Sequence, residues 1–306
     1  MLTTVPIATQ LLTRTVKSAI SYKTTATAPT RGAGWGREDV CILPMTGEPI
    51  MLNSLKRLNG ASIEATDGFV GEVKEAYFDD ERWAIRYLVV ETGNWLNERR
   101  VLISPYSVEH PPLQPISSIK VKLTRQQVKD SPDIDTHKPI SRRHEQAVLD
   151  YYAYPDYWGG VGLWAMGGFP ILEPMAPAEV MDSRHLRYPE KVAPEDVHLR
   201  SSAHVKGYSI QAIDGTIGHV KDFIFDDESW ALRYLLVDTR DWWPGGRCVL
   251  IAVPWIEDID WTEHTVSVQL TREQIRNSPA YDEEKMIDRS YEQRLHAVYG
   301  RKGYWD

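Results

Sequence analysis

Residues 67–92 read DGFVGEVKEAYFDDERWAIRYLVVET, and residues 214–239 read DGTIGHVKDFIFDDESWALRYLLVDT. The two stretches match at 16 of 26 positions without a gap, at an offset of 147 (214 − 67). A period of this length indicates two similar domains, because solenoid repeats are much shorter.

The match continues through the rest of each copy at the same offset. Further pairs are Leu123–Gln127 with Leu270–Gln274, Ser131-Pro132 with Ser278-Pro279, Glu145-Gln146 with Glu292-Gln293, and Tyr157-Trp158 with Tyr304-Trp305. We therefore predict one domain over residues 51–158, a Gly- and Pro-rich linker over 159–199, and a second domain over 200–306.

Residues 1–50 differ from the rest of the chain. They carry basic residues but no acidic residue before Glu38. This composition fits a disordered tail or a targeting segment. A third reading is a misassigned start, with Met51 as the true first residue.

The composition is that of a globular protein and restricts the classes of partner. Of the 306 residues, 42% are hydrophobic and 25% are charged, as in ordinary two-domain proteins. The net charge of −8 argues against a nucleic-acid partner, which usually requires a basic face. No uncharged apolar run reaches the roughly 18 residues needed to span a bilayer. We expect a soluble, cytoplasmic protein with no membrane span.

The sequence shows no recognisable cofactor, metal or catalytic motif. Cys41 and Cys248 are too few for a disulfide framework or a four-cysteine zinc site. The acidic segments 79–81 and 226–228 are read as hairpin turns, with a hard-cation site as the sharper alternative. We therefore predict a protein that is not an enzyme and needs no cofactor.

Runs of β-branched and aromatic residues, separated by turn residues, predict five strands in each copy. In the first copy they are 62–65, 70–78, 84–91, 100–104 and 116–123. In the second copy they are 208–212, 216–225, 231–238, 247–251 and 265–270. Thr124 and Thr271 each begin a capping box that predicts a short helix. Ser141 and Asp288 then cap a second helix in each copy, ending near Tyr152 and Tyr299.

The repeated Asp-Gly-x-x-Gly-x-Val-Lys and Phe-Asp-Asp-Glu-x-Trp-x-x-Arg-Tyr-Leu-x-Val motifs resemble the PRC-barrel family. That family is named after the cytoplasmic domain of the H subunit of the bacterial photosynthetic reaction centre. The Leu-Thr-Arg-x-Gln, Ser-Pro and Tyr-Trp elements resemble a bacterial subgroup with two copies per chain. The resemblance implies a mainly β fold of two small, strongly bent antiparallel barrels, each followed by short C-terminal helices. No segment here is expected to match the N-terminal transmembrane helix of the H subunit, and this departure argues against a reaction-centre role.

What the family has in common is protein–protein contact. The resemblance therefore implies an adaptor or scaffold with an unidentified protein partner, and self-association stays open. One alternative is an accessory role in photosynthetic light reactions, supporting electron transfer as the H subunit does. Another is small-ligand binding at the junction of the two barrels.

Large apolar side chains follow the third strand of each copy. Trp95 and Leu96 lie in one loop, and Trp242 and Trp243 lie in the other. Tryptophan anchors dominate many interfaces, so we predict that these residues bind the partner. The alternative is that each loop folds back over its own barrel.

Arg86 and Arg233 stand inside the most apolar strand of each copy. By simple alternation Arg86 shares a face with Leu88, and Arg233 shares one with Leu235. A buried arginine needs a carboxylate or several carbonyl oxygens, so we predict a structural ion pair at each. A ligand-anion site is the alternative. At the start of the same strands, Trp83 and Trp230 are predicted core residues.

Overall fold

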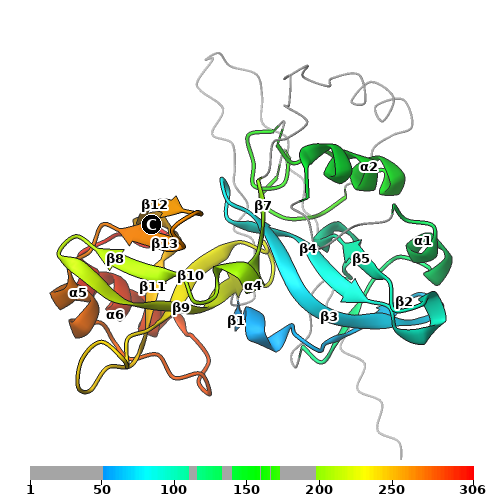
Figure 1. Cartoon of the computed structure of the whole chain (residues 1–306). Coiled ribbons are helices and arrows are strands. Elements are labelled where there is room, and N and C mark those ends of the chain that lie inside the picture. Colours follow the sequence, from blue (N-terminus) through cyan, green and yellow to red (C-terminus); the bar gives the residue numbers. More distant parts are fainter. Residues whose placement is uncertain (1–50, 110–115, 133–139, 159, 166, 173–197) are drawn as a thin grey trace, which may run out of the picture. The chain divides into compact units, whose positions relative to one another are not determined.

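The computed structural model describes residues 51–109, 116–132, 140–158, 160–165, 167–172 and 198–306 (Figure 1). The predictions for the tail 1–50, and for linker residues 173–197, fall outside the described residues. Gly47–Asp306 form one compact unit.

The described chain is mainly β, with two sheets and a few short helices, as predicted. The sheet of the first copy runs in the order β5 (Arg100–Ile103), β4 (Ala84–Glu91), β3 (Gly68–Asp79), β2 (Ser62–Ala65) and β6 (Ser118–Lys120). The sheet of the second copy runs in the order β11 (Cys248–Ala252), β10 (Leu232–Asp238), β9 (Gly215–Asp226), β8 (Ser209–Ala212), β13 (Thr265–Val268) and β12 (Ile256–Asp260). Each path is open, with an edge strand at both ends.

Each sheet contains one parallel pair, β2 with β6 and β8 with β13. The expectation of purely antiparallel sheets is therefore wrong at this pair. More than fifty residues separate the two strands along the chain, which is ample for the crossover that parallel strands require.

The long strands are bent by β-bulges at matched positions. Between β3 and β4 the register shifts twice, which leaves Lys74 and Arg86 as the extra residues. The same shifts between β9 and β10 leave Lys221 and Arg233 as the extra residues. A bulge bends its strand and redirects one side chain, so each arginine leaves the alternation of its strand. The alternation from which a shared face of Arg86 with Leu88 was predicted is therefore interrupted at the bulge.

Four helices begin directly after the capping residues that the sequence predicted. The capping boxes of Thr124 and Thr271 are formed, at α1 (Arg125–Lys129) and α5 (Arg272–Asn277). Helices α2 (Arg142–Tyr152) and α6 (Arg289–Tyr299) follow Ser141 and Asp288. The remaining helical segments are α4 (Ser202–Val205) and the 3₁₀ turns η1 (Leu55–Arg57), η2 (Gly93–Leu96), η3 (Pro105–Ser107) and η4 (Val253–Trp255). Within the described ranges, no helix has the length and apolar character to cross a membrane.

Two short strands that the sequence did not predict are exchanged between the copies. β1 (Leu52–Ser54) begins the first copy but pairs with β9 of the second. β7 (Leu199–Ser201) begins the second copy but pairs with β3 of the first. The registers correspond at the offset of 147, since Leu52 faces Asp226 and Leu199 faces Asp79. Each sheet is therefore completed by a strand from the other copy.

Reciprocal polar contacts fix both exchanged strands. Ser54 donates to Asp222 at 2.5 Å, and its counterpart Ser201 donates to Glu75. At the neighbouring positions Asn53 donates to Asp227 at 3.1 Å, and Arg200 donates to Asp80 at 2.6 Å.

The copies also meet directly through a bridge between Ala84 and Ala231. Ile85 N–H donates to the Trp230 carbonyl at 2.8 Å, and Leu232 N–H donates to the Trp83 carbonyl at 2.7 Å. Equivalent residues thus make the same bonds in both directions, as in an isologous interface with approximate twofold symmetry.

The main core is continuous across the two copies. Phe78 of the first copy lies against Phe223 of the second, with ring centroids 5.4 Å apart. Trp230 is fully buried and Trp83 is partly buried against the same core. Both tryptophans have positive φ values, 58° and 55°, at the end of the acidic turn.

Candidate functional site

The acidic turn of each copy is closed by its own first aspartate. Asp79 Oδ1 accepts the N–H groups of Glu81 and Arg82, at 2.9 and 3.2 Å. Its other oxygen accepts Arg86 Nη2 at 3.0 Å. In the second copy, Asp226 holds its turn in the same way and pairs with Arg233 at 2.6 Å. Both arginines therefore lie in ion pairs with the turn that precedes their strand.

The bulge directs Arg86 against aromatic side chains. Its guanidinium carbon lies 3.7 Å from the ring centroid of Tyr157 and 4.7 Å from that of Trp164. Arg86 Nη1 donates to the Leu163 carbonyl at 2.7 Å. Only 1% of the arginine is exposed.

Helix α2 adds a buried carboxyl group to this cluster. Glu145 accepts hydrogen bonds from Tyr157 and from Arg142 Nη1, the latter at 3.3 Å. Arg142 also donates to the Tyr157 hydroxyl at 3.0 Å. Burial raises the pKa of Glu145 to about 7, although Arg142 and the Tyr157 hydroxyl oppose the shift.

The second copy has the same arginine and carboxyl group, but a different tyrosine bonds the carboxyl group, since Tyr234 is the counterpart of Tyr87 and not of Tyr157, and one member is new. Arg289 pairs with Glu292 at 3.0 Å, and the Tyr234 hydroxyl donates to Glu292 at 2.7 Å. His296, which replaces Leu149 of the first copy, lies 3.0 Å from the same hydroxyl through Nε2. Burial lowers the pKa of His296.

The two clusters differ in what covers the arginine. In the first copy, Arg82 holds the covering segment through the carbonyl oxygens of Tyr157, Trp158, Gly160 and Gly162. In the second copy Ser229 occupies the position of Arg82, and its side chain is too short to make such bonds. The Arg233 side chain is 24% exposed, against 1% for Arg86.

The two aromatic loops also differ. Trp95 donates through Nε1 to the Val70 carbonyl and packs on the core. The guanidinium carbon of Arg125 lies 4.3 Å from the centroid of its ring. Leu96 is partly buried, as is Trp243, which packs on the core. Trp242 is 38% exposed. The first loop is thus folded back on its own copy, whereas the second presents one tryptophan outward.

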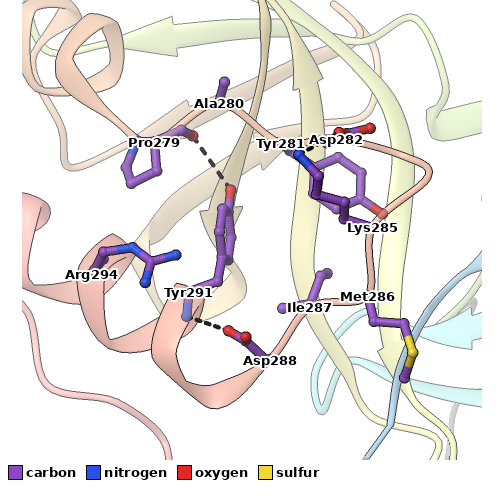
Figure 2. A pocket seen from close by; sticks show the side chains of 10 residues that line it. All are labelled: Pro279, Ala280, Tyr281, Asp282, Lys285, Met286, Ile287, Asp288, Tyr291 and Arg294. Carbon is purple, nitrogen blue, oxygen red and sulfur yellow. Dashed lines mark hydrogen bonds and ion pairs between the residues drawn. The ribbon is translucent and has the colours of Figure 1, made fainter.

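A hollow of about 290 Å³ lies between α6 and the segment 279–288, which connects α5 to α6 (Figure 2). Tyr291 stands at its centre, and its hydroxyl donates to the Pro279 carbonyl at 3.4 Å. Met286, 65% exposed, lies at its edge. Arg86 and Arg233 are not among its lining residues.

Sequence reasoning missed Arg82, Glu145 and Arg142 as members of one cluster. The repeat carried the signal for two of them, because Arg142 and Glu145 recur as Arg289 and Glu292, whereas Arg82 is replaced by Ser229. In the ranges that the structure describes, no three His, Cys, Asp or Glu side chains are grouped to hold a metal ion.

No model of a known protein family matches the chain, and no curated protein matches it. The candidate surfaces therefore rest on geometry alone. They are the open Arg233 cluster and the loop that carries Trp242.

Proposed function

We propose that the chain is a tandem PRC-barrel-type protein that acts as an adaptor without chemistry of its own. The repeated motifs support the family. The bulged strands and the two C-terminal helices of each copy fit its strongly bent barrels. A fold by itself does not define a function, so the proposal depends on a surface.

That surface is the loop around Trp242. Its counterpart Trp95 has its indole N–H bonded and its ring under an arginine, while Trp242 leaves 38% of its surface open to solvent. The repeat makes this difference informative, because both loops follow equivalent strands and are closed by equivalent threonine bonds, yet only Trp95 has its indole held by a carbonyl and an arginine among the described residues. An outward tryptophan at a loop tip is the kind of side chain that anchors an interface.

The test compares wild type, Trp242→Ala and Trp95→Ala as immobilised baits in extract of the native organism, with bound proteins quantified. We expect the Trp242→Ala bait to retain at least tenfold less of a partner protein than the wild-type bait does. The unfolding free energy of Trp242→Ala should differ from wild type by less than about 0.5 kcal/mol. Trp95→Ala should instead lower that free energy by about 1–3 kcal/mol, because it opens a packed site. Retention of the same proteins by the Trp242→Ala bait would refute the proposal.

A further inference from the structure

In the first copy the arginine site is filled by a segment of the chain itself, residues 160–164. The Leu163 carbonyl accepts Arg86 Nη1, and the Trp164 ring lies 4.7 Å from the guanidinium carbon. The same ring lies 4.9 Å from Tyr106, and Trp164 Nε1 donates to the Ser229 carbonyl at 2.7 Å. Trp164 is only 3% exposed. A Leu-Trp pair therefore supplies both the hydrogen-bond acceptor and the aromatic cover.

The second copy has the equivalent ion pair and tyrosine ring, without the covering Leu-Trp segment. Arg233 is paired with Asp226 and lies over Tyr304, with 4.2 Å between its guanidinium carbon and the ring centroid. Its Nη2 makes the bond to Asp226, and its Nε has no hydrogen-bond partner among the described residues, as is also true of Arg86 Nε under its cover. Val253 replaces Tyr106, so the wall that faces Trp164 in the first copy is smaller in the second. We call this place the Arg233 recess.

We propose that the Arg233 recess binds an extended peptide segment of a partner protein that carries a Leu-Trp pair. Its leucine carbonyl would accept a free guanidinium N–H of Arg233, and its indole would lie flat over the guanidinium. By the twofold relation, the indole N–H would donate to the Arg82 carbonyl, the counterpart of the Ser229 carbonyl. This inference rests on the proposed function, because it names the partner chemistry of an interaction module.

The charge of the recess favours a carbonyl oxygen over an anion. Asp226 is 1% exposed and already neutralises Arg233 at 2.6 Å. A carboxylate or phosphate ligand would meet that buried negative charge as well as the arginine. A neutral peptide carbonyl fills the remaining donor without adding charge to the site.

The recess should bind more weakly than the first copy holds its own segment. Arg82 bonds two carbonyl oxygens of that segment, Gly160 and Gly162, and two just before it, whereas Ser229 supplies none of those bonds. Weak, reversible binding of a short segment is typical of an adaptor whose affinity comes from several sites together.

The first experiment uses a fluorescently labelled peptide with the sequence of residues 160–168, GVGLWAMGG, titrated against the full chain. We expect saturable anisotropy. Arg233→Met in the protein, or alanine in place of the peptide's tryptophan, should each weaken binding about tenfold or more. Arg240→Met is the matched control, since Arg240 is an exposed arginine of the same copy paired with Asp238, and it should leave binding unchanged. No saturation at millimolar peptide, or equal binding to Arg233→Met, would overturn the inference.

A second measurement keeps the inference testable if Arg233→Met fails to fold. Residues 160–168 are appended after Asp306, which holds the position of Gly159, so the added segment keeps the register that it has in the first copy. We expect the Leu-Trp version to melt a few degrees above a version with serine at both positions, because the tether raises the local peptide concentration. Equal melting temperatures would contradict binding of a Leu-Trp segment at the Arg233 recess. That outcome would leave the Trp242 bait experiment, and hence the proposed function, standing.

Discussion

Arg86 and Arg233 are equivalent residues that differ in their surroundings. Each sits at a bulge and pairs with the first aspartate of its turn. Arg86 is enclosed by Tyr157, Trp164 and the Leu163 carbonyl, whereas a quarter of the Arg233 side chain meets solvent. The same ion pair should therefore contribute differently to stability in the two copies.

We expect Arg86→Met to lower the free energy of unfolding by about 3–5 kcal/mol, because it leaves Asp79 buried and unpaired. Arg233→Met should lower it by about 1–2 kcal/mol, since water can reach the site. Urea unfolding of both variants against wild type measures the difference. Equal losses would show that the cover over Arg86 has no energetic role.

Glu145 makes stability depend on pH. Its pKa is raised from an ordinary value of 4.5 to about 7 in the folded chain, so the folded state holds a proton that the unfolded state releases. Its contribution is complete below about pH 4.5 and is lost as pH rises through 7. Asp227, whose pKa burial raises to about 6, adds a second loss in the same direction.

Glu145→Gln should remove the first of these two dependences. Between pH 4.5 and 8, wild type should lose about 1–3 kcal/mol more of its unfolding free energy than the variant does. Denaturant midpoints measured across that range give both curves. Parallel curves would mean that Glu145 stays ionised in the fold.

At the scale of the elements, local sequence signals predicted where single strands and helices begin and end. They did not predict which distant strands pair. Strands β2 and β4 begin and end at the predicted residues, because each is a clear hydrophobic run between turns. The capping boxes of Thr124 and Thr271 were readable for the same reason. β1 and β7 are three residues long, too short to show a period, and their partners lie in the other copy.

The candidate surfaces were only partly readable from the sequence. An ion pair was predicted for each arginine, and its partner lies in the acidic turn, but the bulge that places the arginine is invisible to simple alternation. Trp95 and Trp242 look equivalent in sequence. Their difference arises from packing, since the first loop reaches the Val70 carbonyl and Arg125.

The exchanged strands give a prediction for Arg200. Arg200→Pro should disrupt β7 and speed hydrogen exchange of Tyr77–Asp79 in the first copy, because those residues pair with β7. Arg200→Ala, which removes the bond to Asp80 and the contact with the Trp261 ring but keeps the backbone of β7, is the control and should have a smaller effect. If Arg200→Pro altered exchange only in the second copy, the pairing of β7 with β3 would be wrong.

At the scale of the whole molecule, the two copies depend on each other. Each completes its sheet with a strand from the other, and one core cluster contains residues of both. Reciprocal bonds through Trp83 and Trp230 join them at the centre of their contact. A sequence with two clear repeats thus folds into one packed unit, in which neither copy carries all of its own strands, and we expect this unit to unfold cooperatively.

The most direct test of this unit is hydrogen exchange after a substitution in one copy. Ile103 is fully buried in β5, and Ile103→Ala should lower stability by about 2–5 kcal/mol. We expect the slowest amides of β10 and β11, in the other copy, to lose the same free energy of protection as those of β4. If β10 and β11 kept their wild-type protection while β4 lost its own, the copies would unfold independently and the account of exchanged strands would be contradicted.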